Sequence, residues 1–178
     1  MHSCKEDVQP ELTRKEYLRL LSTAKNLGKE QAYLLIKIFA TTSITLQELQ
    51  KLTVESVREN RVLVRDHGCQ RMIHIPACVR SELLCYAAQK GIYRGPIFVT
   101  KAGKPLKRTS VSSVINRLCH DAQVPKEKGN PRCLKRLYQT TQAGIEANIA
   151  LLVEQAHDNI VEREQLSIGW SFENVSGL

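Results

Sequence analysis

The sequence predicts a mostly helical α+β fold with a small β-hairpin or three-stranded sheet. Apolar residues recur at helical spacing over most of the chain, which predicts amphipathic helices. Residues 61–75 instead alternate between apolar and polar side chains about a short turn, which predicts two paired strands. The chain has 178 residues, of which 42% are hydrophobic and 25% charged. This length and composition suit one ordinary domain with its own core.

Three helices are expected in the first third of the chain. Thr13 and Glu16 have the spacing of a capping box, so a helix begins there and ends at Gly28. A second helix covers residues 30–42 and is apolar on most sides, which predicts that it is the central buried helix. A short third helix begins after Thr45.

The small sheet is expected in the middle of the chain. Residues 61–65 and 71–75 alternate like strands, and His67 with Gly68 forms the turn between them. Residues 97–99 form a short apolar stretch, which is expected to be a third strand.

The remaining elements are helices. Residues 77–90 are expected to form an amphipathic helix. Thr109 is placed to cap the next helix along the chain, and a further helix begins near Pro131. Apolar residues between 145 and 160 then mark one face of a long helix.

Positive charge is concentrated in one stretch. Residues 101–136 contain ten Lys and Arg and only two acids, which is a net charge of +8 in 36 residues. The rest of the chain has 16 basic and 16 acidic side chains. A basic block of this kind is typical of a surface that binds nucleic-acid phosphates, and the alternative is a charged face that only contacts solvent.

Several other classes of protein do not fit the sequence. No apolar run reaches 18 residues, and residues 1–10 are polar, so we expect neither a membrane span nor a signal peptide, and a cytoplasmic location. None of the six cysteines forms a CxxC pair, and no two histidines have ligand spacing. We therefore expect no metal or other cofactor, and cysteines that are free thiols.

Four stretches, in order, resemble the catalytic domain of the tyrosine recombinases, the phage-integrase family. They are residues 12–21, 39–49, 71–76, and 95–106 with 130–138. The resemblance implies the tyrosine-recombinase catalytic-domain fold over residues 12–166, with a leader at 1–11 and a tail at 167–178. It also implies double-stranded DNA as the partner and a role in DNA recombination or integration. The family's N-terminal core-binding domain has no counterpart here.

In that family a tyrosine attacks a DNA phosphate and forms a 3′-phosphotyrosyl bond. Two arginines, a lysine and histidines neutralise the charge that builds on the phosphate oxygens. Arginine suits this task because its planar guanidinium can donate to two oxygens at once.

Most of these catalytic positions hold other residues in this sequence. The first arginine is replaced by Thr45, which has no charge, and the lysine position falls at or near Asp66, whose carboxylate would repel phosphate. In the His-x-x-Arg motif, Arg132 stands for the histidine and Lys135 for the second arginine. Both stay cationic, but Arg132 cannot act as a base near neutral pH. His157 is either the family's later histidine or an ordinary polar helix residue.

The nucleophile is missing from its expected region. The last tyrosine is Tyr138, and residues 139–178 contain none. Tyr138 falls where the family has a buried aromatic residue, so we expect it in the core. We therefore expect a DNA-binding relative with little or no catalytic activity. Its phosphate contacts would be Lys101, Lys104, Lys107, Arg108, Arg132, Lys135 and Arg136.

Two alternatives stay open. The protein is an active recombinase if its nucleophile is displaced or is supplied by a partner. It is a protein-interaction module if residues 139–178, with six acids and one arginine, bind a second copy or another recombinase. The simpler expectation for the apolar face at 145–160 is packing on the chain's own core.

Overall fold

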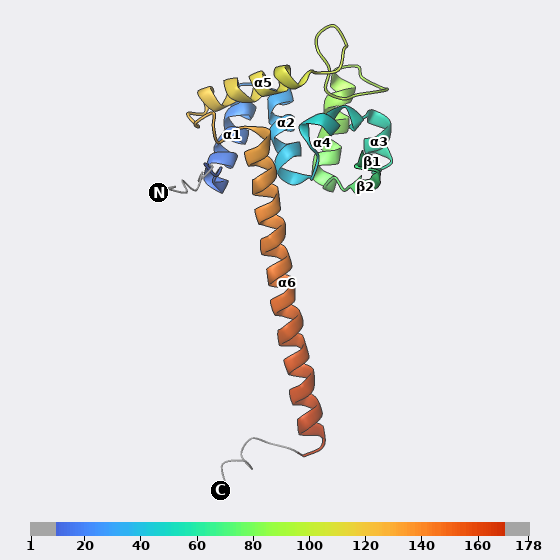
Figure 1. Cartoon of the computed structure of the whole chain (residues 1–178), viewed down its shortest axis with the longest axis vertical. Helices are drawn as coiled ribbons and strands as arrows, with labels where there is room; N and C mark the ends of the chain where they lie inside the picture. The colour runs from blue at the N-terminus through green and yellow to red at the C-terminus, as the bar shows by residue number, and fades with distance from the viewer. Residues whose placement is uncertain (1–9, 170–178) are drawn as a thin grey trace, which may run out of the picture. The chain divides into compact units, whose positions relative to one another are not determined.

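A computed structural model describes residues 10–169 (Figure 1). Most of the predicted leader and tail, residues 1–9 and 170–178, lies outside the described residues. The chain divides into two compact units between Gln139 and Thr140, which are described separately. The elements are α1 (Arg14–Asn26), α2 (Glu30–Thr41), the 3₁₀ helix η1 (Leu46–Lys51), α3 (Val54–Arg58), β1 (Val62–Asp66), β2 (Cys69–Ile73), α4 (Ala77–Gln89), α5 (Arg108–Asp121) and α6 (Pro131–Ser167).

Helix α2 lies at the centre of the first unit and packs against α1, α4 and α5 (Figure 1). Leu35, Ile36, Ile38 and Phe39 are each at most 1% exposed. Side chains this close in sequence point to different sides of a helix, so α2 is covered nearly all round. The prediction of a central buried helix is confirmed.

The first helix begins as its capping box predicts. The Glu16 N–H donates to the Thr13 hydroxyl at 3.2 Å, and the Thr13 N–H donates to the Glu16 carboxylate at 3.3 Å. Gly28 follows the end of α1 with a φ of +67°, a conformation that glycine adopts without strain. The cap predicted at Thr109 is wrong, because Lys107 is the N-cap and α5 already begins at Arg108.

The sheet of the described residues has two strands rather than three. Antiparallel β1 and β2 pair from Val62 with Ile73 to Asp66 with Cys69, around the predicted turn. Residues 97–99 form no strand, because Val99 makes only an isolated bridge with Pro105, and Pro96, just before them, makes one with Thr53. Proline has no N–H to donate, so a ladder cannot extend through these positions.

The second unit is helical over its described part, because α6 continues to Ser167. Ile145, Ile149, Leu152 and Ile160 are 47%, 54%, 62% and 54% exposed. Nothing within the described part of the second unit itself buries this apolar face, so the expected burial in the chain's own core is not met there. Helical periodicity predicts an apolar face but does not specify what covers it.

Candidate nucleic-acid interface

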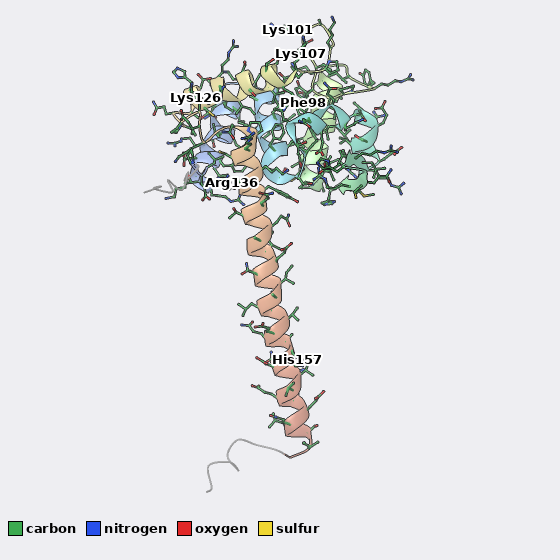
Figure 2. All side chains as sticks on the ribbon, in the orientation of Figure 1. Phe98, Lys101, Lys107, Lys126, Arg136 and His157 are labelled. Carbon is green, nitrogen blue, oxygen red and sulfur yellow. The ribbon has the colours of Figure 1, made fainter. Side chains whose placement is uncertain are left out.

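The predicted DNA-contacting residues of the first unit form two groups. The α5 cluster consists of Lys101, Lys104, Lys107 and Arg108, which lie just before and at the N-terminus of α5. The α6 cluster consists of Arg132, Lys135 and Arg136, in the first turns of α6. Helix α5 has 14 residues and is therefore about 20 Å long. The Gly129 carbonyl, just before α6, accepts from the Cys119 thiol at 3.9 Å, so α6 begins near the C-terminal end of α5. Figure 2 shows Arg136 away from the edge of the first unit that carries Lys101 and Lys107.

A tight turn presents the first two lysines of the α5 cluster. The Thr100 N–H donates to the Lys104 carbonyl at 2.7 Å, and the Gly103 N–H donates to the Thr100 carbonyl at 2.9 Å. Gly103 has a φ of +80°, which favours glycine at this position. Lys101 and Lys104 are exposed as a result, and Figure 2 shows Lys101 near Lys107 at one edge of the first unit.

The N-terminus of α5 adds to this positive charge. Among the described residues, no side chain caps the helix at Lys107. The first N–H groups of a helix have no partner within the helix, and its dipole carries a partial positive charge at that end. The start of α5 therefore favours an anion beside the four cations.

The α6 cluster is held by its neighbours in the same turns. Asn130 caps the helix by accepting from the Cys133 N–H at 2.9 Å, and it donates to the Glu127 carbonyl at 3.0 Å. Cys133 and Leu134 are 7% and 0% exposed, and they anchor the helix in the core of the first unit. Arg132 is fully on the surface, whereas Lys135 and Arg136 are half-buried.

Most of these cations are not neutralised within the protein. Among residues 10–169, no ion pair involves Lys101, Lys104, Lys107, Arg108, Arg132 or Lys135. Lys128 lies between the clusters in sequence, but its ammonium group is 3.1 Å from the Glu16 carboxylate. Of the cations between the two clusters, Lys128 is therefore neutralised, whereas Arg117 and Lys126 are exposed and, among the described residues, in no ion pair.

Thr45, the residue predicted to stand for the family's first arginine, is part of a structural network. Thr45 precedes η1, and its N–H donates to the Glu48 carboxylate at 2.9 Å. One terminal nitrogen of Arg71 is 2.7 Å from each Glu48 oxygen, and the other donates to the Ser43 carbonyl at 3.1 Å. Thr45 is thus linked through Glu48 to an arginine whose charge is already paired.

The charges of this pair are fixed near neutral pH. Burial alone would raise the pKa of Glu48, but the hydrogen bonds from Thr45 and Arg71 outweigh burial and lower the pKa. Arg71 is therefore held as a structural cation rather than a free phosphate ligand. Its role was not predicted, because Glu48 and Arg71 are far apart in sequence and only the fold brings them together.

The structure does not bond the other predicted catalytic residues to one another within the part of the chain that it describes. Asp66 ends β1 with a side chain 63% exposed, and its carboxylate lies 3.4 Å from the His67 ring. His157 is an exposed helical residue of the second unit (Figure 2). Among the described residues, no hydrogen bond or ion pair joins any two of Thr45, Asp66, Arg132 and Lys135.

All five tyrosines lie in the described part of the chain. Burial raises the pKa of Tyr17 and of Tyr86, which keeps their hydroxyls protonated. The Tyr33 hydroxyl accepts from the Lys37 ammonium at 2.9 Å, and Tyr93 is 64% exposed. Tyr138 was expected in the core, but it is only half-buried and lies in α6, just after the α6 cluster.

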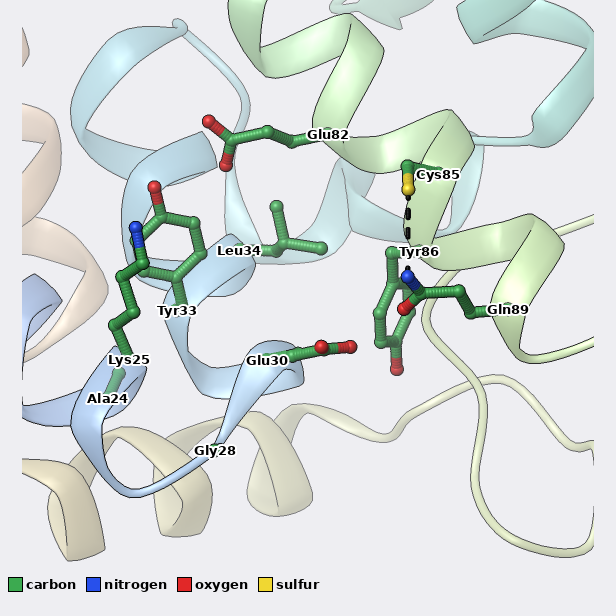
Figure 3. A pocket seen from close by; sticks show the side chains of 10 residues that line it. All are labelled: Ala24, Lys25, Gly28, Glu30, Tyr33, Leu34, Glu82, Cys85, Tyr86 and Gln89. Atoms are coloured by element: carbon green, nitrogen blue, oxygen red, sulfur yellow. Dashed lines mark hydrogen bonds between the residues drawn. The ribbon is translucent and has the colours of Figure 1, made fainter.

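A cavity of about 420 Å³ lies between α1, α2 and α4 (Figure 3). Its lining residues are Ala24, Lys25, Gly28, Glu30, Tyr33, Leu34, Glu82, Cys85, Tyr86 and Gln89. None of the predicted DNA contacts lines it, so this cavity is separate from both basic clusters. Within residues 10–169, no three His, Cys, Asp or Glu side chains lie close enough together to hold a metal ion. No helix in that range is long and apolar enough to cross a membrane.

The geometry corresponds to a known class of fold. The structure is similar to the crystal structure of XerA recombinase, with a TM-score of 0.64 and 19% sequence identity. The match covers 79% of this chain and 52% of that one, so the chain spans about half the length of the recombinase. Neither a protein-family model nor a curated protein sequence matches the chain. The structural likeness confirms the predicted fold class, a mostly helical α+β domain similar to a tyrosine-recombinase catalytic domain.

Proposed function

We propose that this protein binds double-stranded DNA through the α5 and α6 clusters and does not cut it, as part of a recombination or integration system. The observation that carries the proposal is the set of six cations in the two clusters that no acid neutralises within the described residues. Lys and Arg contacts to phosphates supply most of the affinity of such a surface and little sequence preference.

The α5 cluster suits a phosphate group, because its four cations lie just before and at the start of a helix, where the helix dipole is positive. The uncapped start of α5 adds backbone N–H donors for a phosphate oxygen.

The absence of cleavage follows from the side chains at the family's catalytic positions. No tyrosine follows Tyr138, and Thr45 and Asp66 supply no positive charge. Arg71, the nearest arginine linked to Thr45, is neutralised by Glu48. Loss of a single group that stabilises the transition state costs about a hundred- to a thousandfold in rate.

Charge reversal tests the binding surface. The double variant Lys101→Glu/Lys107→Glu should weaken binding to a labelled duplex by about tenfold or more, because two phosphate contacts become repulsive. The matched control is Arg58→Glu/Arg61→Glu, the same charge change at exposed positions outside both clusters. Equal losses in the two variants would contradict the proposed surface.

A nicked suicide substrate tests the absence of cleavage. Incubation with the full chain should leave no covalent protein–DNA adduct. A phosphotyrosyl adduct, with or without an added recombinase, would favour the alternative of an active enzyme whose nucleophile is displaced or supplied by a partner.

A further inference from the structure

The second unit has an exposed apolar stripe that nothing in the described chain covers. The stripe consists of Ile145, Ile149, Leu152, Val153, Ala156 and Ile160, and its five large side chains are 47% to 62% exposed. Apart from the adjacent pair Leu152 and Val153, these positions recur at intervals of three or four residues, so they share one side of α6. A contiguous apolar surface of this kind is typical of a protein interface.

The stripe is symmetric about its midpoint, between Leu152 and Val153. In two antiparallel helices related by a two-fold axis, residues at equal distances from the axis face each other. An axis at this midpoint pairs Ile145 with Ile160, Ile149 with Ala156, and Leu152 with Val153. Every stripe residue then has an apolar partner.

The sizes of the facing residues also match. The long side chain of Ile149 on one helix meets the small Ala156 on the other, twice in the symmetric pair. Alternation of large and small side chains lets facing helices interdigitate. The stripe from residue 145 to 160 is about 22 Å long, which is roughly four helical turns.

We propose that two copies of this chain associate by antiparallel pairing of the α6 stripe about the Leu152–Val153 midpoint. The stripe of each chain is therefore covered by the same stripe of the second copy. The surface is separate from the basic clusters, so this interface and the proposed DNA binding can fail independently. When both hold, the dimer presents two DNA-binding units joined in one particle.

Mass measurement of the full chain without DNA tests the association. Sedimentation over a range of concentrations should reveal a monomer–dimer equilibrium. The variant Ile149→Gln/Leu152→Gln should be monomeric, because it removes the central apolar side chains while glutamine keeps a good helix propensity. The control Leu151→Gln changes an exposed leucine that faces away from the stripe, and it should still form dimers.

The helix content of each variant is measured by circular dichroism, which distinguishes loss of the helix from loss of the interface. A chain that stays monomeric at every concentration while its helix is intact would overturn the proposal. So would a dimer that the stripe variant does not weaken.

Cysteine cross-linking tests the register. In a background with Cys4, Cys69, Cys78 and Cys85 changed to serine, a mixture of Ile145→Cys and Ile160→Cys chains should form a disulfide-linked heterodimer on oxidation. Either variant alone should form none, since identical positions at the stripe ends lie about 20 Å apart in the antiparallel pair. Rapid cross-linking of Ile145→Cys with itself would indicate parallel helices and overturn the proposed register.

Discussion

At the scale of single residues, the Glu48–Arg71 pair is the charged contact to which Thr45 is linked. The Arg71 guanidinium donates to both Glu48 oxygens at 2.7 Å, and Glu48 is only 15% exposed. Glu48→Gln leaves the Arg71 cation half-buried without its counter-charge. We expect a loss of about 2 kcal/mol in the free energy of unfolding near neutral pH.

The same pair predicts a pH dependence. Because folding lowers the pKa of Glu48 from its ordinary 4.5, its stabilising effect is present above that value. The effect disappears as the pH falls through the lowered pKa, so the variant and the natural protein should converge in stability in acid. Urea unfolding near neutral pH and in acid measures the stability difference between the variant and the natural protein. The control is Glu11→Gln, at an exposed position. A constant difference at all pH values would contradict the explanation.

Gly129 is constrained by a close contact in the core of the first unit. A Cβ at this position would lie 1.9 Å from the Cys119 sulfur, and Cys119 is 0% exposed. Gly129→Ala should therefore destabilise the protein by roughly 1–3 kcal/mol in thermal or chemical unfolding. The double variant Gly129→Ala/Cys119→Ala should recover part of this loss, because it removes the sulfur; no recovery would show that the contact is not the cause.

The same burial controls the chemistry of Cys119. Removal from water raises the pKa of its thiol to about 11, so the thiol stays protonated near neutral pH. A protonated thiol is a poor nucleophile, so Cys119 is a packing residue.

At the scale of elements, α6 contains one residue that weakens it. Gly144 lies within the helix, and a Cβ built there meets nothing within 4 Å. Gly144→Ala should therefore stabilise the helix by about 0.5–1 kcal/mol through a lower conformational entropy of the unfolded chain. In far-UV circular dichroism during heating, the variant should keep more helix than the natural chain at high temperature. A variant that keeps less helix would contradict this explanation.

Helices and turns with local signals could be predicted from the sequence. The capping box at Thr13, the hairpin turn at His67 and the helix of residues 77–90 depend on neighbours in the chain, and the structure confirms them. The third strand and the cap at Thr109 were wrong. The bridges beside residues 97–99 involve prolines, which have no N–H to extend a ladder. Helix α5 begins at Arg108, with Lys107 as its N-cap, before Thr109 is reached.

At the scale of the whole molecule, the sequence identified the basic residues but not their arrangement. It predicted one block between residues 101 and 136, whereas the structure divides the predicted contacts between the start of α5 and the first turns of α6. The pairing of Lys128 with Glu16 and of Arg71 with Glu48 depends on long-range folding. No local pattern could therefore have shown which cations are already neutralised.

The central claim is that two cationic clusters on a recombinase-like fold hold duplex DNA by its phosphates. Equilibrium binding of the full chain to a labelled duplex, at increasing NaCl, measures this most directly. Each phosphate contact contributes about −0.9 to the slope of log K against log salt, so six contacts predict a slope of about −5. Binding that is absent at low salt, or a slope near zero, would contradict the account.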